Sequence, residues 1–383
     1  MKILAVDHNA ISTAGQAVYR ALGRSGEIRV RVLVPSRWYD SYRVMKFGRR
    51  ESDHGFSIMS SPVLFHTRTH RLLYLHLRRH IDEFEPDIVF MNSEPENFQT
   101  FHAARLLKRR KNVILVFSTW RNIDVTRHGY PYKFGPLHAL VEKAVLQRAD
   151  YAVAFNESAR RILEQLGFPR AVVIPPAVDT TLFSKASQEQ GRGSNLSFRI
   201  GYIGRFVSGK GIDVLLRAIR SLSFEFHITM VGDGPERRSL KRLADDLGLT
   251  DRIIWHGAVA QSELPFILNS MNVLVLPSRT EKHWKEQFGR VLIEAMACGV
   301  PVIGSSSGEI PQVIGGVGMV FEEGNSEALA LGLSRLYEDV GLRTRLSGAG
   351  IERVHNRYSV PVVARAYESF FRSLKETSAI PRA

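Results

Sequence analysis

Short apolar runs rich in β-branched residues alternate with amphipathic helical patterns along the whole chain. In the first half, helical patterns near residues 14–23, 98–109 and 157–166 lie between strand-like runs, which are KILAVD (2–7), RVRVLVP (29–35), DIVFMN (87–92), VILVFS (113–118), DYAVAFN (150–156) and AVVIPP (171–176). This rhythm predicts a parallel sheet with helices on both faces.

The same alternation begins again after residue 197. Helical patterns near 212–221, 235–247, 262–268 and 289–297 separate a second set of runs, which are FRIGYIG (198–204), FHITMVG (226–232), RIIWHG (252–257), VLVLPS (273–278) and PVIGS (301–305). We therefore predict an α/β protein with two Rossmann-like, doubly wound domains and a cleft between them.

The domain limits follow from composition. Residues 1–183 form the predicted first domain, the polar stretch 184–197 with KASQEQGRGSN is the linker, and 198–358 form the second domain. Residues 359–383 predict a helix whose apolar positions follow helical spacing. The pattern does not decide which sheet receives this helix, and packing back on the first domain is one alternative.

The stretch GRFVSGKG, from Gly204 to Gly211, resembles a nucleoside triphosphate loop until its last position. That loop requires a hydroxyl after its lysine to hold magnesium, and Gly211 has none. Because the stretch lies between a strand end and a helix start, it is placed to bind an anion. Arg205 and Lys210 supply a fork and a point charge, which suit a diphosphate without magnesium. The alternative is that both cations only solvate a surface turn.

Two glutamates stand in EQFGRVLIEAMACGVPVIG, residues 286–304. Glu294 lies in an otherwise apolar helical stretch, where an unpartnered carboxylate is costly to bury, so we expect it to meet hydroxyl groups such as those of a ribose. Glu286, at the mouth of the turn, could accept a hydrogen bond from a sugar hydroxyl. The backbone amides of Phe288, Gly289 and Arg290 point into the same space. Helix capping with a salt bridge is the alternative.

These residues together resemble a known family. Gly204-Arg205 with Lys210-Gly211, VGDGP at 231–235, LPS at 276–278, and the Glu286-x7-Glu294 pair with EAMACGVPVI are similar in order and spacing to the retaining GT-B glycosyltransferases of family 4. The resemblance is strong over residues 198–325 and weak over the first half.

The resemblance implies a hexosyltransferase that uses a nucleotide diphosphate sugar and acts with retention. It places Arg205 and Lys210 on the diphosphate, Glu294 on the ribose, Glu286 with the following amides on the hexose, and the base near Val259 in the stretch 256–259. The acceptor, a glycan or a lipid-linked glycan, would bind the first domain. No D-x-D triplet occurs in the chain, which fits a mechanism without metal or other cofactor.

The first domain departs from the family pattern. Its first loop, STAGQAVYR, carries Gly15 alone, and no histidine follows the strand VILVFS. Trp120 or Asn122 could take over the acceptor-side contact, although ordinary packing explains Trp120 equally well. His66 and His70 stand four residues apart but lack the acidic partner of a zinc helix, so we interpret them as solvated histidines.

The net charge of +14 is concentrated in residues 1–180, where 27 Lys and Arg face 17 Asp and Glu, or +10. Without a nucleic-acid-binding motif, this field favours an anionic membrane surface over nucleic acid. The basic stretches 69–80 and 105–111 fit such a surface, or are solvated helix faces. No run reaches the roughly 18 apolar residues of a membrane span. With one cysteine, Cys298, and no leader pattern, we expect a cytoplasmic protein, peripheral on the membrane at most.

Two rival functions remain open on the same residues. A nucleotide-sugar epimerase on this fold would need no acceptor. A non-catalytic basic adaptor for a membrane or nucleic acid would tolerate loss of Glu286 and Glu294.

Overall fold

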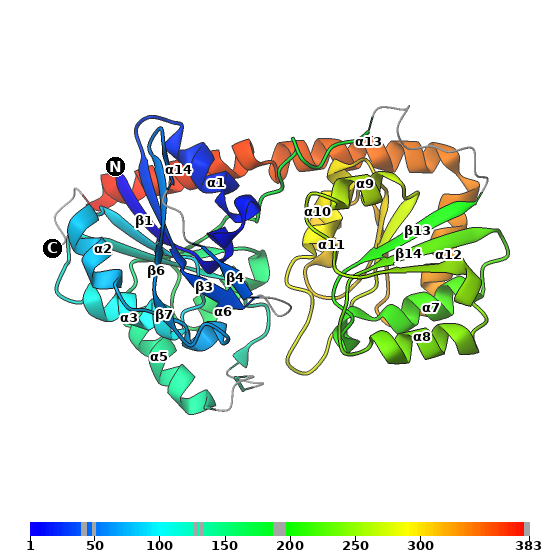
Figure 1. Cartoon of the computed structure of the whole chain (residues 1–383), viewed down its shortest axis with the longest axis horizontal. Helices are drawn as coiled ribbons and strands as arrows, with labels where there is room; N and C mark the ends of the chain where they lie inside the picture. The colour runs from blue at the N-terminus through cyan, green and yellow to red at the C-terminus, as the bar shows by residue number, and fades with distance from the viewer. Residues whose placement is uncertain (40–43, 48–50, 126–128, 131–133, 187–196, 379–383) are drawn as a thin grey trace. The chain divides into compact units, whose positions relative to one another are not determined.

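The computed structural model describes residues 1–39, 44–47, 51–125, 129–130, 134–186 and 197–378 (Figure 1). The chain forms two compact units, one made of residues 1–177 together with those from 360 onward, the other of residues 178–359. Both are parallel α/β units, which confirms the predicted fold class. The cleft between them stays a prediction.

The first unit is built on an eight-stranded sheet in the order β12-β11-β10-β9-β1-β2-β6-β5, parallel except for β5 against β6. Its strands are β1 (Lys2–Val6), β2 (Arg29–Pro35), β5 (Glu51–Asp53), β6 (Phe56–Ser61), β9 (Ile88–Met91), β10 (Ile114–Thr119), β11 (Tyr151–Ala154) and β12 (Ala171–Val173). Its helices are α1 (Thr13–Gly23), α2 (Leu77–Phe84), α3 (Phe98–Leu106), α5 (Gly135–Arg148), α6 (Glu157–Gln165) and α14 (Val360–Ser378).

Strand β1 shows why helices cover both faces of this sheet. Ile3 and Ala5 belong to one buried cluster, whereas Leu4 and Val6 belong to another on the opposite face. Side chains alternate across a strand, so a run that is apolar at every position needs cover on both sides. The four residues are at most 1% exposed.

The last helix, α14, packs on the first unit. Tyr367 and Phe371 contact Phe90 of β9 edge to face, with ring centroids 5.8 and 5.9 Å apart. Val363 and Leu374 join the same cluster. Burial of each such side chain contributes roughly 1.5–3 kcal/mol to the stability of the fold. Residues of α14 therefore complete a core to which the first strand, β1, also belongs.

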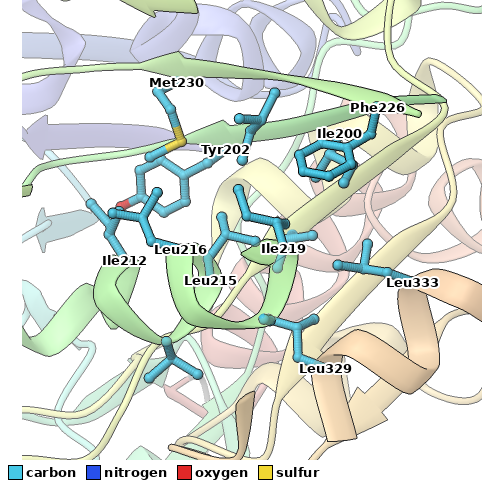
Figure 2. Packing of buried hydrophobic residues seen from close by; sticks show 14 of the residues in the cluster. Ile200, Tyr202, Ile212, Leu215, Leu216, Ile219, Phe226, Met230, Leu329 and Leu333 are labelled. Carbon is cyan, nitrogen blue, oxygen red and sulfur yellow. The ribbon is translucent and has the colours of Figure 1, made fainter. Parts of the chain in front are cut away.

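The second unit has a six-stranded parallel sheet in the order β15-β14-β13-β16-β17-β18. Its strands are β13 (Phe198–Ile203), β14 (Phe226–Val231), β15 (Ile253–His256), β16 (Val273–Leu276), β17 (Val302–Ser305) and β18 (Met319–Phe321). Its helices are α7 (Ile212–Arg220), α8 (Arg237–Asp246), α9 (Leu264–Asn269), α10 (Arg290–Ala297), α11 (Ile310–Ile314), α12 (Ser326–Glu338) and α13 (Val340–Arg357). Figure 2 shows the buried cluster of this unit, in which Leu215 of α7 lies beneath the strands and Leu329 and Leu333 of α12 lie beside α7.

The boundary between the units lies earlier than the sequence suggested. Residues 178–183 belong to the second unit, because the Val178 N–H donates to the Tyr358 carbonyl at 2.8 Å and the Phe183 side chain is 1% exposed. Most of the predicted linker, residues 187–196, lies outside the described residues. Two short hairpins were not predicted either: β3 (Arg37–Tyr39) with β4 (Val44–Lys46), and β7 (Val63–Leu64) with β8 (Leu73–Tyr74).

Candidate active site

The glycine-rich loop connects β13 to α7 in the second unit. Its residues Ser208–Lys210 form one 3-10 turn, and Gly211 adopts φ +61° before α7 begins at Ile212. A Cβ at Gly211 would lie 2.1 Å from the Pro277 carbonyl oxygen. Glycine is therefore required for the loop to pass this close to the residues that follow β16.

The loop brings Lys210 to Glu286. The Lys210 ammonium donates to Glu286 Oε2 at 2.5 Å, and the Ser278 hydroxyl donates to the same oxygen at 2.7 Å. The side chains of Lys210 and Glu286 are 13% and 9% exposed. Burial strengthens such a pair when its remaining polar groups are satisfied, and Ser278 adds a hydrogen bond to the carboxylate.

Three neighbouring strands contribute to this group. Lys210 follows β13, Ser278 follows β16, and Glu309, whose N–H donates to the Glu286 carbonyl at 3.0 Å, follows β17. All three therefore lie at the carboxyl edge of a parallel sheet, where open α/β sheets bind their ligands. The sequence predicted Lys210 and Glu286 at this site, and the structure brings them into contact.

The turn after Glu286 opens helix α10. Gly289 precedes the helix with φ +81° and, as a glycine, has no side chain with which to cap the first turn. Phe288 is buried and contacts Tyr358 edge to face at 5.7 Å, whereas Arg290 is exposed. The helix start thus directs backbone N–H groups to the side where a ligand could accept from them.

Glu294 is buried inside α10 with 8% exposure. Burial raises the pKa of its carboxyl above the ordinary value, and the Arg290 guanidinium opposes that shift. Within the described part of the chain, its carboxylate makes no hydrogen bond or ion pair. Hydroxyl donors would satisfy a buried carboxylate that has no such bonds, and the ribose contact of Glu294 stays a prediction.

Arg205 and Val259 are less closely defined. The Arg205 side chain is exposed, and its guanidinium has no partner among the described residues, although its carbonyl accepts from the Tyr202 hydroxyl at 3.0 Å. Val259 is half-buried in the segment after β15. No described contact brings either side chain to Lys210, so their donor roles stay predictions.

On the acceptor side, the predicted residues are packed into the first unit. The amide of Gly15 donates to the Ser12 hydroxyl in the first turn of α1. Trp120 lies against Phe155 with ring centroids 4.1 Å apart, and Asn122 is 5% exposed. The packing alternative for Trp120 thus has structural support, while the acceptor role of all three residues stays a prediction.

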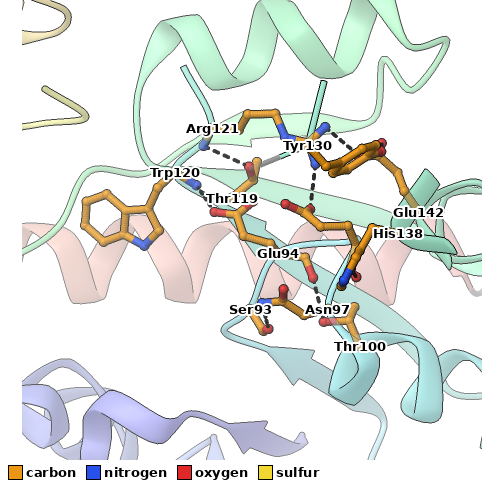
Figure 3. Close-up of polar contacts among 11 residues, drawn as sticks. Ser93, Glu94, Asn97, Thr100, Thr119, Trp120, Arg121, Tyr130, His138 and Glu142 are labelled. Atoms are coloured by element: carbon orange, nitrogen blue, oxygen red, sulfur yellow. Dashed lines mark hydrogen bonds and ion pairs between the residues drawn. The ribbon is translucent and has the colours of Figure 1, made fainter. Parts of the chain in front are cut away.

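Sequence reasoning missed a buried charge cluster beside Trp120, which Figure 3 shows. The Arg121 side chain, 7% exposed, lies 2.5 Å from carboxylate oxygens of both Glu96 and Glu142. Burial alone would lower the pKa of Arg121, but the two carboxylates outweigh it and raise the pKa. One buried cation held by two buried carboxylates fixes the loop after β10 to Glu96 and to Glu142 of α5.

Glu94 belongs to the same region. Its carboxylate accepts a hydrogen bond from the backbone N–H of Trp120 at 2.8 Å. Burial together with the Glu96 charge raises the pKa of Glu94 to about 7.

Of the two histidines that we interpreted as solvated, His70 lies beside the buried His138, with ring centroids 5.4 Å apart. Burial and His138 lower the pKa of His70 to about 4. Within the described ranges, no group of three His, Cys, Asp or Glu side chains is suited to hold a metal ion.

Two Rossmann-like units define an α/β protein, and the second brings Lys210, Ser278 and Glu286 together at the edge of its sheet where open α/β sheets bind ligands. Comparison with known proteins identifies its class. The family described as Glycosyl transferases group 1 matches residues 186–353, and the one described as Glycosyltransferase Family 4 matches residues 16–182. The chain belongs to the GT-B glycosyltransferases of this group 1 and family 4 type, and it is therefore a transferase enzyme.

Individual relatives agree with that membership. The chain is 28% identical over 330 residues to the lipopolysaccharide core biosynthesis glycosyltransferase LpsD of Rhizobium meliloti, covering 84% of this chain and 86% of the relative. The fold is similar to sucrose-phosphate synthase of Thermosynechococcus elongatus, with TM-score 0.74, 20% identity and 98% and 100% coverage. It is also similar to Anabaena HepE in complex with UDP, with TM-score 0.72, 19% identity and 97% and 100% coverage. Across the described residues, no helix is both long and apolar enough to cross a bilayer.

Proposed function

We propose that this glycosyltransferase moves a hexose from a nucleotide diphosphate sugar to a glycan or lipid-linked acceptor, with retention at the anomeric carbon and without metal. The proposal gives the second unit the donor and the first unit the acceptor. It places the enzyme in the assembly of a polysaccharide or lipopolysaccharide.

The contact between Lys210 and Glu286 carries the proposal. A diphosphate needs cations, and a hexose needs hydrogen-bond partners for its hydroxyls. Here one ammonium and one carboxylate, 2.5 Å apart at the carboxyl edge of the sheet, supply both within the span of a single donor. The ligand can therefore bind through both ends of the pair at once.

Glu294 supports a nucleotide as the other part of the donor. Its buried carboxylate has no hydrogen bond within the described residues, and it lies at the start of the second turn of α10, eight residues after Glu286. Two neighbouring hydroxyls, such as those of a ribose, can satisfy one carboxylate bidentately. Such a contact would offset the desolvation that raises the pKa of Glu294.

The proposed reaction is a displacement on one face of the sugar. The acceptor oxygen bonds to the anomeric carbon as the bond from that carbon to the diphosphate oxygen breaks, and the acceptor proton passes to a phosphate oxygen of the donor. Lys210 and Arg205 stabilise the charge that develops on the departing diphosphate. Glu286 and the amides of Phe288, Gly289 and Arg290 orient the hexose, so that catalysis rests on positioning and charge.

Similar proteins support the substrate classes. HepE has been solved with UDP and with UDP-glucose, which supports a nucleotide sugar donor here. LpsD is named as a glycosyltransferase of lipopolysaccharide core biosynthesis. A phosphatidylinositol monomannoside mannosyltransferase of Mycolicibacterium smegmatis is 30% identical over 215 residues, covering 53% of this chain and 54% of that protein. These relatives support a glycan or lipid-linked acceptor.

A panel of nucleotide sugars, tested by thermal shift, identifies the donor, because a ligand that binds the folded state raises Tm. The selected donor is then incubated with candidate acceptors, and NMR of the product reports the anomeric configuration. We expect the donor's configuration in the product and unchanged turnover with EDTA. Inverted configuration, loss of turnover with EDTA, or isomerisation of the donor without any acceptor would each contradict the proposal.

We also propose that the first unit docks on the anionic cytoplasmic face of a membrane. Phe134, Leu137 and Leu140 lie along one side of the start of α5 and are 50%, 46% and 67% exposed. The Arg71 guanidinium lies 5.4 Å from the centroid of the Phe134 ring. Exposed apolar side chains beside a basic residue suit the boundary between headgroups and acyl chains.

Several arginines of the basic stretches 69–80 and 105–111 pair with carboxylates of the protein, so these stretches attract an anionic surface less than their sequence suggested. Arg78 and Arg79 pair with Asp82 and Glu83 on their own helix, and Arg110 also pairs with Asp82. The apolar residues of α5 therefore carry this part of the proposal. Sedimentation with phosphatidylglycerol vesicles should fall about tenfold in Leu140→Glu, and should be unchanged in Leu331→Glu, a control of 73% exposure in the second unit. Equal binding by both variants would contradict docking through α5.

A further inference from the structure

Residues 279–285 form a segment between β16 and Glu286 that hydrogen bonds hold in place. The Arg279 N–H donates to the Gly209 carbonyl at 2.8 Å, and its guanidinium donates to Asp213 at 3.1 Å and to the Ser208 hydroxyl at 3.0 Å. Thr280 donates from both its N–H and its hydroxyl to Glu323, at 2.8 and 2.9 Å. The segment is therefore anchored on the glycine-rich loop and on the residues that follow β18.

A tight turn within this segment fixes Trp284. The Glu281 N–H donates to the Trp284 carbonyl at 2.7 Å, and the Trp284 N–H donates back to the Glu281 carbonyl at 3.3 Å. The indole then lies on Gly209, where an added Cβ would be 2.4 Å from Trp284 Cε3. Glycine at 209 thus permits the ring to reach the backbone of the loop, and the ring in turn holds the loop.

The same ring faces the ammonium of Lys210. The Lys210 nitrogen lies 5.1 Å from the centroid of the indole, within the range of a cation–π interaction, for which tryptophan is the best of the aromatic side chains. An ammonium has three donors, and one of them is used by Glu286. The ring attracts the cation without accepting those donors in a conventional hydrogen bond.

This difference matters when a donor binds. The proposed function needs Lys210 on the diphosphate and Glu286 on the hexose, so their hydrogen bond has to be exchanged for bonds to the ligand. The carboxylate then no longer holds the ammonium, whereas the indole still can. The ring keeps the cation at the end of the loop while leaving its N–H groups for phosphate oxygens.

We propose that Trp284 is a positioning residue that holds Lys210 on the diphosphate of the bound nucleotide through the face of its indole. This inference rests on the proposed function. It goes beyond that function by assigning a role to the segment 279–285. The competing explanation is that Trp284 only fills the space above Gly209.

A double-mutant cycle on nucleotide affinity separates the two explanations. UDP, GDP and ADP are titrated calorimetrically into the full-length wild type, and the one that binds is used for Trp284→Leu, Lys210→Ala and the double variant. We expect Trp284→Leu to weaken binding roughly 5- to 30-fold in the wild type and to have little effect once Lys210 is alanine. Equal losses in both backgrounds would overturn the positioning role.

A graded series protects the test against misfolding. Trp284→Tyr and Trp284→Phe retain an aromatic face, so affinity should decrease from Trp through Tyr and Phe to Leu, with Tm recorded for each variant. Phe266→Leu, an exposed aromatic of α9 at 79%, is the matched control and should bind like the wild type. Equal affinity in Trp284→Phe and Trp284→Leu, or affinity that follows Tm across the series, would overturn the inference. If the wild type binds no nucleoside diphosphate, the proposed function fails instead.

Discussion

Lys210 and Glu286, which are 76 residues apart in the sequence, form one hydrogen-bonded ion pair. The proposed function assigns these two side chains to different parts of the donor. Each side chain therefore occupies the place of the ligand group that the other is proposed to bind: Glu286 stands where the diphosphate would meet Lys210, and Lys210 stands where the hexose would meet Glu286. Because both are largely buried, breaking the pair without a replacement would leave desolvated charges, which opposes opening of the site when no donor is present.

Replacing Glu286 should separate binding from transfer. In Glu286→Gln the hexose loses a charged partner, and Lys210 no longer has to leave a carboxylate to reach the diphosphate. We expect transfer to fall about 100-fold or more, while nucleoside diphosphate affinity stays constant or improves. Steady-state kinetics and calorimetry measure the two effects. Glu352→Gln, on the exposed side of α13, is the control, and a parallel loss of affinity and turnover would contradict this assignment.

Glu294 should show a conflict between stability and function. Burial raises the pKa of its carboxyl from 4.5, so its favourable contribution to folding is present below that pH and is lost as pH rises through the raised value. Glu294→Gln should therefore have a higher Tm than the wild type at pH 7.5, and the difference should close toward pH 4.5. Nucleotide affinity should fall roughly 10- to 100-fold, as expected for loss of charged hydrogen bonds. A lower Tm at pH 7.5 would count against an unpartnered carboxylate.

Two glycines with similar backbone angles should respond differently to alanine. Gly211 has φ +61° and Gly248 has φ +67°, but a Cβ meets the Pro277 carbonyl only at Gly211, because the space around Gly248 is open. Gly248→Ala should cost about 1 kcal/mol in the free energy of unfolding, from backbone strain alone. Gly211→Ala should cost at least about 2 kcal/mol and also weaken nucleotide binding, since the loop must move. Urea titration and calorimetry would reveal equal responses if the contact with Pro277 is unimportant.

Glu94 should make stability depend on pH near neutrality. Its pKa is raised to about 7 by burial and by Glu96, so its contribution to folding is lost between about pH 4.5 and pH 7 as the pH rises. Glu94→Gln keeps an oxygen for the Trp120 N–H and removes that dependence. Urea unfolding at pH 5 and pH 8 should show the variant more stable only at pH 8, by about 3 kcal/mol at most. A constant difference across this range would show that Glu94 does not titrate there.

The sequence predicted those elements whose local pattern matches their environment. The run FRIGYIG is apolar where β13 is buried, and the helical pattern at 212–221 corresponds to α7 at Ile212–Arg220. The β3–β4 and β7–β8 hairpins escaped prediction because strands of two or three residues have too few positions to show a period. The placement of α14 escaped because an amphipathic face shows that a helix packs, but not on which sheet.

The candidate site leaves a signal in the sequence where the chemistry of a residue conflicts with its surroundings. Glu294 in an apolar helix and a lysine in a glycine-rich loop are unusual locally, and both pointed to a ligand. Ser278 was noted only as part of LPS, and Arg121 not at all, because their partners Glu286, Glu96 and Glu142 lie elsewhere in the sequence. A buried ion cluster built from two loops and a helix that are distant in the sequence leaves no local signal.

The placement of α14 has a consequence for how the chain acquires its structure during synthesis. All of residues 178–359 have been made before Val363, Tyr367 and Phe371 leave the ribosome, so the unit encoded second can finish folding first. The unit encoded first must wait with the side of β9 that carries Phe90 uncovered. A premature stop after Ser359 would therefore harm the unit whose own coding region it leaves almost intact.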